Sequence, residues 1–334
     1  TTPESWEVQK LLREMADQGC THVVMEVSSH ALVLHRVDGI QFAAGIFTNL
    51  TQDHLDFHKT MEEYRRAKGL LFQQTGVAVL NLDDEAGRYY HQTVSCPQIT
   101  YSECRDEADL TAKNIRLFPG HVSFEGVTAG ALCRIHLPIP GGFTIYNALG
   151  VMACGLALGL SLDKMAAALR GVKGVKGRIE VVPVPADYTV IIDYAHSPDA
   201  LENILTTVRD FTPGRLICLF GCGGDRDRSK RPVMGGIAAA LADLAIVTSD
   251  NPRTEPPETI IAEILQGMET KNYLVEPDRR MAIRCALDQA GPGDVVVLAG
   301  KGHETYQEIN GIQYHLDERE EVAAYFQAQN MRAI

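Results

Sequence analysis

Apolar runs alternate with helical runs from Arg178 onward, and this alternation constrains the fold more than any other feature of the chain. The expected strands are Thr189–Ile192, Leu216–Phe220, Leu244–Thr248 and Val295–Leu298. The expected helices lie near Asp199–Val208, Pro232–Leu241, Pro257–Met268 and Asp278–Gln289. Such an order is typical of βαβ units and predicts a mostly parallel sheet. A hairpin around Asn310-Gly311 and a helix over Asp317–Gln329 are expected to follow it.

A glycine-rich turn follows the second of these strands, in the sequence LFGCGGDRDRSKRP at Leu219–Pro232. Its four cationic residues are Arg226, Arg228, Lys230 and Arg231. Glycines let a backbone approach an anion, and the N-terminus of the next helix presents N–H groups to it. Guanidinium groups suit carboxylate or phosphate. A solvated loop between strand and helix explains the same pattern equally well.

Three more polar stretches each follow an apolar run: DYAH at Asp193–His196, SDNPR at Ser249–Arg253 and AGKGHE at Ala299–Glu304. Turns of this kind converge on one edge of a doubly wound sheet. We therefore expect the three stretches and the glycine-rich turn to form one site.

The first half of the chain begins with a helix after Pro3, followed by an expected buried strand over Thr21–Val27. Glu26 ends that strand, and His54 follows a second apolar run at Ala43–Thr48. Carboxylate and imidazole groups at strand ends suit a divalent cation. Glu26 as a structural loop acid, and His54 as a capping histidine, are the simpler alternatives.

A capping box at Thr60–Glu63 opens a helix that carries Lys68, and a further strand is expected over Val77–Asn81. Short β-like runs between Ile99 and Leu137 favour an antiparallel addition to the sheet. The fold class is therefore α/β, with two domains divided in the segment Gly171–Gly177. We expect domains at 1–176 and 177–334, the second being Rossmann-like.

Composition excludes several classes of protein. The net charge of −12 argues against nonspecific nucleic-acid binding, so the arginines of the glycine-rich turn suit a small anion better. No apolar run is long enough to span a bilayer, and the first residues show no secretory pattern. The 8 cysteines form no CxxC pair, which predicts reduced thiols. We expect a cytoplasmic monomer.

Seven stretches together resemble the Mur ligase family: MEVSSHAL, TNLTQDHLDFH, YRRAK, DYAHSPDAL, FGCGGDRDRSKRP, SDNPR and GKGHETYQ. The resemblance covers essentially the whole chain and is closest to the members that act on meso-diaminopimelate. It implies ATP- and Mg²⁺-dependent addition of that amino acid to UDP-N-acetylmuramoyl-L-alanyl-D-glutamate, for peptidoglycan precursor synthesis. The carboxylate of the nucleotide sugar becomes an acyl phosphate, which the amine then attacks.

The resemblance also implies roles for residues that match the family's motifs. Residues matched to the UDP-muramoyl dipeptide are Thr1, Thr2, Ser28 and Arg36. Glu26 and His54 match Mg²⁺ ligands, and Lys68 matches a carbamylated lysine that supports a second Mg²⁺. Residues matched to the nucleotide are Asn147, Arg178 and Asp193. Residues matched to diaminopimelate are Arg226, Asp250, Asn251, Pro252, Arg253, Gly300 and Glu304.

The sequence departs from the family in two places. Leu34 stands where the family usually has glutamine, and the chain has no GxxxxGK[ST] motif. We therefore expect only a central, incomplete ATP-binding domain and a C-terminal domain, without ligase turnover by this chain alone, because the phosphate cradle is missing.

Three other functions remain open: a binding module without nucleotide chemistry, a lysine-adding ligase and a folylpolyglutamate-type ligase. Arg253 favours diaminopimelate over lysine, because the distal carboxylate needs a cation.

Overall fold

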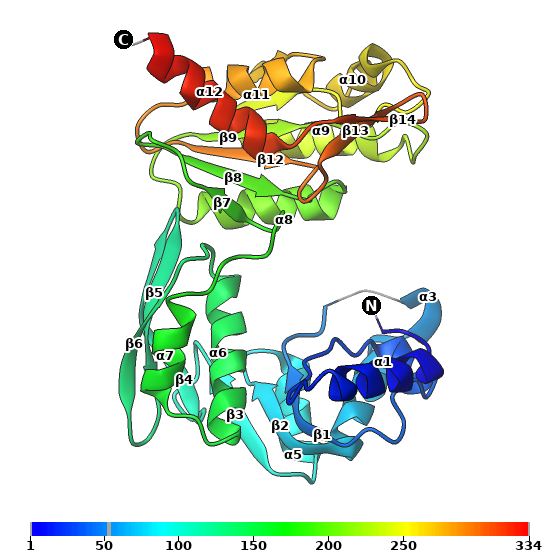
Figure 1. The fold of residues 1–334 in the computed structure, drawn as a ribbon, viewed down its shortest axis with the longest axis vertical. Helices are drawn as coiled ribbons and strands as arrows, with labels where there is room; N and C mark the ends of the chain where they lie inside the picture. Colours follow the sequence, from blue (N-terminus) through cyan, green and yellow to red (C-terminus); the bar gives the residue numbers. More distant parts are fainter. Residues whose placement is uncertain (1, 52–54, 333–334) are drawn as a thin grey trace. The chain divides into compact units, whose positions relative to one another are not determined.

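The computed structural model describes residues 2–51 and 55–332, which divide into two compact units (Figure 1). The first unit comprises the described residues of Thr1–Ile115, together with Phe124–Ile135 and Ile145–Ala168. The second unit comprises Arg116–Ser123, His136–Thr144 and the described residues of Leu169–Ile334. The α/β class predicted from the sequence is confirmed, because both large sheets contain parallel strands.

One six-stranded sheet has the order β1-β2-β3-β4-β5-β6. Its strands are β1 (Phe42–Phe47), β2 (Thr75–Asn81), β3 (Gln98–Ser102), β4 (Leu110–Phe118), β5 (His121–Val127) and β6 (Leu132–Leu137). Strands β1 to β4 pair in parallel, whereas β4, β5 and β6 are joined by tight turns at 119–120 and 128–131. The expected antiparallel addition over Ile99–Leu137 is thus wrong for β3, because alternating side chains do not report strand direction.

The helices of this part include the one that carries Lys68. They are α1 (Ser5–Asp17), α2 (Ser29–Val33), α3 (Leu55–His58), α4 (Met61–Gly69), α5 (Glu85–Thr93), α6 (Phe143–Ala157), α7 (Leu162–Leu169) and the 3₁₀ helix η1 (Leu70–Gln74). The Thr60 hydroxyl caps α4 by accepting a hydrogen bond from the Glu63 N–H, at 3.1 Å. The start of this helix is therefore the one that the sequence predicts.

The strand expected over Thr21–Val27 is absent from the structure, so that prediction is wrong. This segment forms neither helix nor strand, and 97% of the Val24 side chain is exposed. A strand needs a hydrogen-bonding partner, and β1, at the edge of its sheet, pairs only with β2 among the described residues. Glu26 consequently lies on an exposed loop instead of at the end of a buried strand.

The second sheet has the order β11-β10-β9-β12-β8-β7 and confirms the alternation predicted from Arg178 onward. Its strands are β7 (Glu180–Val182), β8 (Thr189–Asp193), β9 (Leu216–Phe220), β10 (Leu244–Val247), β11 (Tyr273–Val275) and β12 (Val295–Ala299). All neighbouring strands pair in parallel except β7 and β8, which are antiparallel. The short edge strands β7 and β11 were not expected from the sequence.

Helices α8 (Pro198–Arg209), α9 (Lys230–Leu241), α10 (Pro257–Leu265) and α11 (Arg279–Gln289) connect the strands, and α12 (Glu318–Arg332) follows them. A hairpin of β13 (Tyr306–Ile309) and β14 (Ile312–His315) turns at Asn310 and Gly311, as predicted. Both turn residues have positive φ, at 49° and 77°, which suits this residue pair.

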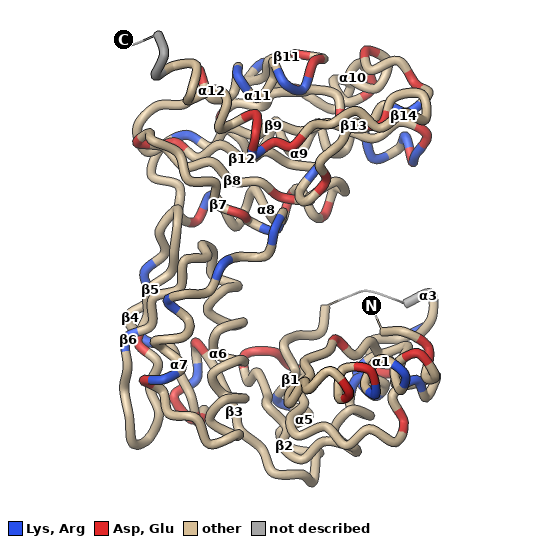
Figure 2. Tube along the Cα trace, viewed as in Figure 1, with Lys and Arg blue, Asp and Glu red and all other residues tan. Residues whose placement is uncertain are grey.

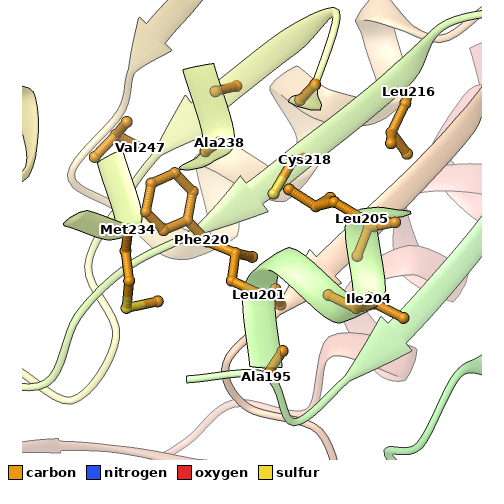
Figure 3. Close-up of a cluster of buried hydrophobic side chains, with 14 of the residues drawn as sticks. Ala195, Leu201, Ile204, Leu205, Leu216, Cys218, Phe220, Met234, Ala238 and Val247 are labelled. Carbon is orange, nitrogen blue, oxygen red and sulfur yellow. The ribbon is translucent and has the colours of Figure 1, made fainter. Parts of the chain in front are cut away.

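The second unit has buried apolar clusters on both faces of its sheet, one against helices α8, α9 and α10 and the other against α11 and α12. Leu201 and Leu205 from α8, Met234 from α9 and Phe220 of β9 belong to one of these buried clusters (Figure 3). Every residue of β9 is buried, and each large side chain of this kind stabilises the fold by about 1.5–3 kcal/mol. A rigid central strand therefore carries the glycine-rich turn.

Candidate functional site

The carboxyl ends of three neighbouring strands, β10, β9 and β12, bring the predicted loops together. The Arg253 side chain donates to the Gly224 carbonyl oxygen, at 2.8 Å, and the Arg253 N–H donates to the Glu308 carbonyl oxygen. The Lys301 ammonium donates to the Asn251 side-chain oxygen, at 2.6 Å. The loops after β9, β10 and β12 and strand β13 thus contact one another, as the sequence predicts for such turns.

An acid–lysine cluster, which consists of Asp250, Asn251, Lys301 and Glu304, lies at this edge. The Lys301 ammonium is fully buried and lies 3.2 Å from both Asp250 Oδ1 and Glu304 Oε2. The Asn251 amide nitrogen donates to Glu304 Oε2 at 3.0 Å. Two carboxylates therefore share one ammonium, which leaves the cluster one negative charge in excess.

A buried arginine lies beside the acid–lysine cluster. Arg279 is fully buried and donates to Glu318 Oε1 and to the carbonyl oxygens of Ser249 and Ala299. Burial raises the pKa of Asp250, but the charges of Lys301 and Arg279 outweigh it, so this pKa lies below its usual range. Asp250 is accordingly an anion at neutral pH.

Two glycines are required where these loops approach one another. A Cβ on Gly224 would lie 1.9 Å from the Pro252 carbonyl oxygen, which is impossible without moving the loop. Gly300 has a φ of +115°, and its Cβ would lie 2.8 Å from Asp250 Oδ2. Pro252 and Gly300, both matched to diaminopimelate, therefore contribute backbone shape in this structure.

Arg253 and Arg226 supply cationic groups near the cluster. Arg253 adopts a φ of 52°, and its Nε lies 3.2 Å from Glu308 Oε2. Its Nη2 has no hydrogen-bond partner within the described part of the chain. Arg226 is exposed, and among residues 2–51 and 55–332 its guanidinium donates only to the Asp225 carbonyl oxygen, at 3.3 Å. Both guanidinium groups thus keep donors for a carboxylate.

The other cations of the glycine-rich turn do not form an anion site, which corrects the sequence-based expectation for them. Arg231 is fully buried and pairs with Glu255 and Glu263, and Arg228 also pairs with Glu263. The Lys230 ammonium donates to the His196 carbonyl oxygen, at 2.7 Å. Figure 2 shows acidic as well as basic residues around β13 and β14. The cations are neighbours in the sequence, which suggested one basic group. Glu255 and Glu263, which pair with Arg231, come later in the chain, just before α10 and on it.

The residues matched to the nucleotide lie on different elements. Asp193 ends β8 and accepts hydrogen bonds from the N–H groups of Ile179 and Ala195, at 2.8 and 2.9 Å. Burial raises its pKa. The Arg178 guanidinium lies 5.4 Å from the centre of the Tyr194 ring, and Asn147 is exposed on α6. Asp193 retains oxygen lone pairs that suit hydroxyl donors such as those of ribose.

The structure brings together the residues matched to the UDP-muramoyl dipeptide that it describes. The Thr2 hydroxyl donates to the Glu26 carbonyl oxygen at 2.9 Å and accepts from the Ser28 N–H at 3.0 Å. Arg36 donates to the Thr2 carbonyl oxygen at 3.2 Å and pairs with Glu4. Thr1 lies outside the described residues, and Leu34 is half exposed at the end of α2.

Lys68 is half buried on α4, where its ammonium lies 5.2 Å from the centre of the Tyr64 ring. That ring stacks on His58, whose Nε2 lies 2.8 Å from the Ser29 hydroxyl oxygen. His54 lies outside the described residues. Among the residues that are described, no three His, Cys, Asp or Glu side chains form a metal-binding group. The Glu26 carboxylate is exposed, and its hard oxygens suit Mg²⁺.

Lys301 and Arg279 were not predicted as site residues. Lys301 belongs to AGKGHE, so its presence in that motif was a usable signal. Arg279 follows an N-cap aspartate at the start of α11 and resembles an ordinary helix residue in sequence.

None of the described helices is both long and apolar enough to cross a bilayer.

Comparisons with family models identify both halves of the chain. The Mur ligase middle domain matches residues 1–155, and the Mur ligase, glutamate ligase domain matches residues 177–302. The UDP-N-acetylmuramoyl-L-alanyl-D-glutamate--2,6-diaminopimelate ligase 1 of Clostridium acetobutylicum is 47% identical over 97% of this chain and 68% of its own. The corresponding Clostridium botulinum ligase is 49% identical over 96% of this chain and 66% of its own.

Solved structures agree with these matches. A structure of UDP-N-acetylmuramoyl-L-alanyl-D-glutamate--2,6-diaminopimelate ligase is 36% identical, with a TM-score of 0.80 over 99% of this chain and 69% of that one. MurF ligase from Thermotoga maritima, in complex with ADP, shares the fold at 17% identity and a TM-score of 0.60, over 92% of this chain and 66% of its own. The chain spans about two thirds of the length of these relatives. On this evidence the chain belongs to the Mur ligase family.

Proposed function

We propose that this protein is an ATP-dependent ligase that adds meso-diaminopimelate to UDP-N-acetylmuramoyl-L-alanyl-D-glutamate, and so serves peptidoglycan precursor synthesis. The named relatives that are almost half identical to it act on these compounds. All 8 cysteines are free thiols, which supports a reducing, cytoplasmic compartment. We further propose that residues 1–176 form the ATP-binding domain and 177–334 the amino-acid-binding domain.

The acid–lysine cluster is the observation that carries this proposal. Its excess negative charge suits a substrate ammonium, and the available guanidinium donors of Arg226 and Arg253 suit substrate carboxylates. Meso-diaminopimelate has two ammonium and two carboxylate groups, so it needs both kinds of partner. Lysine has no distal carboxylate and would leave one arginine without a counter-charge.

The nucleotide and the nucleotide sugar have their own residues in the proposal. Bound ATP supplies the phosphoryl group that activates the substrate carboxylate. Residues proposed to hold ATP are Asn147, Arg178 and Asp193, and residues proposed to hold Mg²⁺ are Glu26, His54 and carbamylated Lys68. Those proposed to orient the UDP-muramoyl dipeptide are Thr1, Thr2, Ser28 and Arg36.

Calorimetric titration of the chain tests the amino-acid specificity directly. Meso-diaminopimelate, L-lysine and L-glutamate are titrated separately, and meso-diaminopimelate is expected to bind most tightly. Preference for lysine or glutamate would favour the related ligases instead. Ligation by this chain alone is tested by expressing it in a bacterium depleted of its own diaminopimelate-adding ligase. No growth is expected, because the chain has no GxxxxGK[ST] motif to hold the phosphates, and growth would contradict that expectation.

A further inference from the structure

We propose that Lys301 is a positioning residue, which orients Asn251 and Glu304 for the amino acid without contacting it. This inference rests on the proposed function and extends it to a side chain that is buried beneath the site. Lys301 begins the loop after β12, directly after Gly300.

The three hydrogens of the Lys301 ammonium are matched by three acceptors. They are Asn251 Oδ1 at 2.6 Å, Asp250 Oδ1 at 3.2 Å and Glu304 Oε2 at 3.2 Å. An ammonium has three donors and no acceptor, so this set uses its full capacity. Because its side chain is 0% exposed, Lys301 cannot reach a ligand in solution.

The orientation of the Asn251 amide follows from these contacts. Its oxygen accepts hydrogen bonds from the Lys301 ammonium and from the Glu308 N–H, at 2.9 Å. Two donors face that position, so the amide nitrogen has to occupy the opposite side. From there it donates to Glu304 Oε2, at 3.0 Å. Lys301 and the Glu308 N–H together thereby select one of the two amide orientations.

The Glu304 carboxylate is held in the same way. Oε2 accepts from both Asn251 and Lys301, whereas Oε1 has no hydrogen-bond partner in the described ranges 2–51 and 55–332. The Glu304 side chain is 17% exposed, so one oxygen is anchored and the other can accept from a ligand. An ammonium is the matching donor, because the cluster carries one uncompensated negative charge.

Removal of Lys301 has two expected consequences. Asp250 and Glu304 lose their shared counter-charge, which costs stability because Asp250 is buried. Asn251 also loses one of the two donors that fix its amide, and Glu304 loses one of its two hydrogen-bond partners, so both side chains are held less firmly. A structural lysine would produce only the first consequence, and a positioning lysine produces both.

The experiment compares Lys301→Met, Lys301→Gln and Glu304→Gln with the unaltered chain, by calorimetric titration with meso-diaminopimelate and by thermal unfolding. Arg215→Met is the control, because Arg215 pairs with the buried Asp294 of the same unit and precedes β9, at the opposite end of that strand from the glycine-rich turn. The double variant Lys301→Met/Glu304→Gln measures the coupling between the two side chains.

Lys301→Met is expected to weaken binding at least about tenfold, as is typical of a lost charge-assisted network. Lys301→Gln keeps a side-chain N–H donor for Asn251, so this variant should lose less affinity than Lys301→Met. The double variant should bind within roughly twofold of Lys301→Met, since both changes remove the same arrangement. Arg215→Met should lower the unfolding temperature and leave affinity unchanged.

Affinity of Lys301→Met within roughly twofold of the unaltered chain, or fully additive losses in the double variant, would overturn the inference. The inference also fails if neither Lys301 variant folds while Arg215→Met does, because Lys301 is then structural. The proposed function is judged separately, on the unaltered chain. If that chain binds lysine instead, the proposed substrate is wrong and the same variants are compared with lysine.

Discussion

The Arg253 guanidinium donates a hydrogen bond to the carbonyl oxygen of Gly224, 2.8 Å away, and so joins the loop after β10 to the glycine-rich turn after β9. Arg253 Nε also lies 3.2 Å from Glu308 Oε2, and the backbone of Arg253 has a φ of 52°. A residue that is strained and held by two other segments is positioned before any ligand arrives. Arg253 therefore has a structural role, and its Nη2 keeps a donor for the substrate carboxylate that we propose it binds.

Arg253→Ala should weaken meso-diaminopimelate binding and affect lysine little, because only the former has a distal carboxylate. A charge-assisted contact contributes roughly 1.5–3 kcal/mol, so the dissociation constant should rise about ten- to a hundredfold. Calorimetry with both amino acids measures how far the dissociation constant of each rises in the variant. Arg209→Ala, which removes an exposed arginine of the same unit, is the control. Equal losses for both amino acids would mean that the link to Gly224 is the main role of Arg253.

Gly224→Ala should destabilise the second unit by about 1–3 kcal/mol, since the new methyl group forces the Pro252 carbonyl away. The same shift should weaken meso-diaminopimelate binding. Gly142→Ala is the matched control, because nothing lies within 4 Å of its added Cβ. Urea unfolding of both variants measures the difference. A Gly224→Ala protein as stable as the control would show that the two loops are not closely packed.

The loop contacts explain how far the sequence could predict this site. Strands β8, β9, β10 and β12 were predicted nearly to the residue, because continuous apolar runs bounded by turns are typical of buried parallel strands. Their order in the sheet places the polar loops after β9, β10 and β12 together, and the sequence motifs had predicted that these loops lie at one edge. Gly224 and Gly300 were therefore expected near Asp250 and Arg253 without any structure.

The errors arose where a pattern depends on long-range partners. Thr21–Val27 has the composition of a strand, but composition cannot supply a neighbouring strand. The cations Arg228 and Arg231 appeared available because Glu263, which pairs with both, lies on α10 and is distant in sequence. Charge pairing and strand pairing are tertiary properties, so a local pattern does not determine them.

Arg231→Met should lower the unfolding free energy, because it removes the buried partner of Glu255 and Glu263. The loss should stay below the roughly 3 kcal/mol at which losses from broken fully buried pairs begin, because both glutamates are partly exposed and Glu263 keeps Arg228. Urea unfolding at neutral pH measures this loss, with Arg209→Met as the exposed control. A loss no larger than that of the control would mean that the two glutamates are adequately solvated without Arg231.

The dependence of the unfolding free energy on pH should reveal the ion pair between Arg231 and Glu255. The hydrogen bond from Arg231 lowers the pKa of Glu255 to about 2, whereas the unfolded chain has the ordinary value near 4.3. The folded state is therefore stabilised above about pH 4.3, and this contribution is lost as the pH falls toward 2. Urea unfolding between these values should show the decline in the unaltered chain and a smaller decline in Glu255→Gln. Identical pH profiles would exclude Glu255 as its source.

Lys68 should take up CO₂ as a carbamate if it supports a second Mg²⁺ as proposed. Carbamylation replaces an ammonium with an anionic carboxylate, whose oxygen atoms suit Mg²⁺. The chain equilibrated with ¹³C-bicarbonate should give a protein-bound carbamate signal in ¹³C NMR. Lys68→Arg should abolish that signal, because a guanidinium stays protonated and does not react in this way. Lys10→Arg, at a lysine whose side chain is 64% exposed, should retain it. A signal that survives Lys68→Arg, or none in the unaltered chain, would leave Lys68 as a cation packed beside the Tyr64 ring.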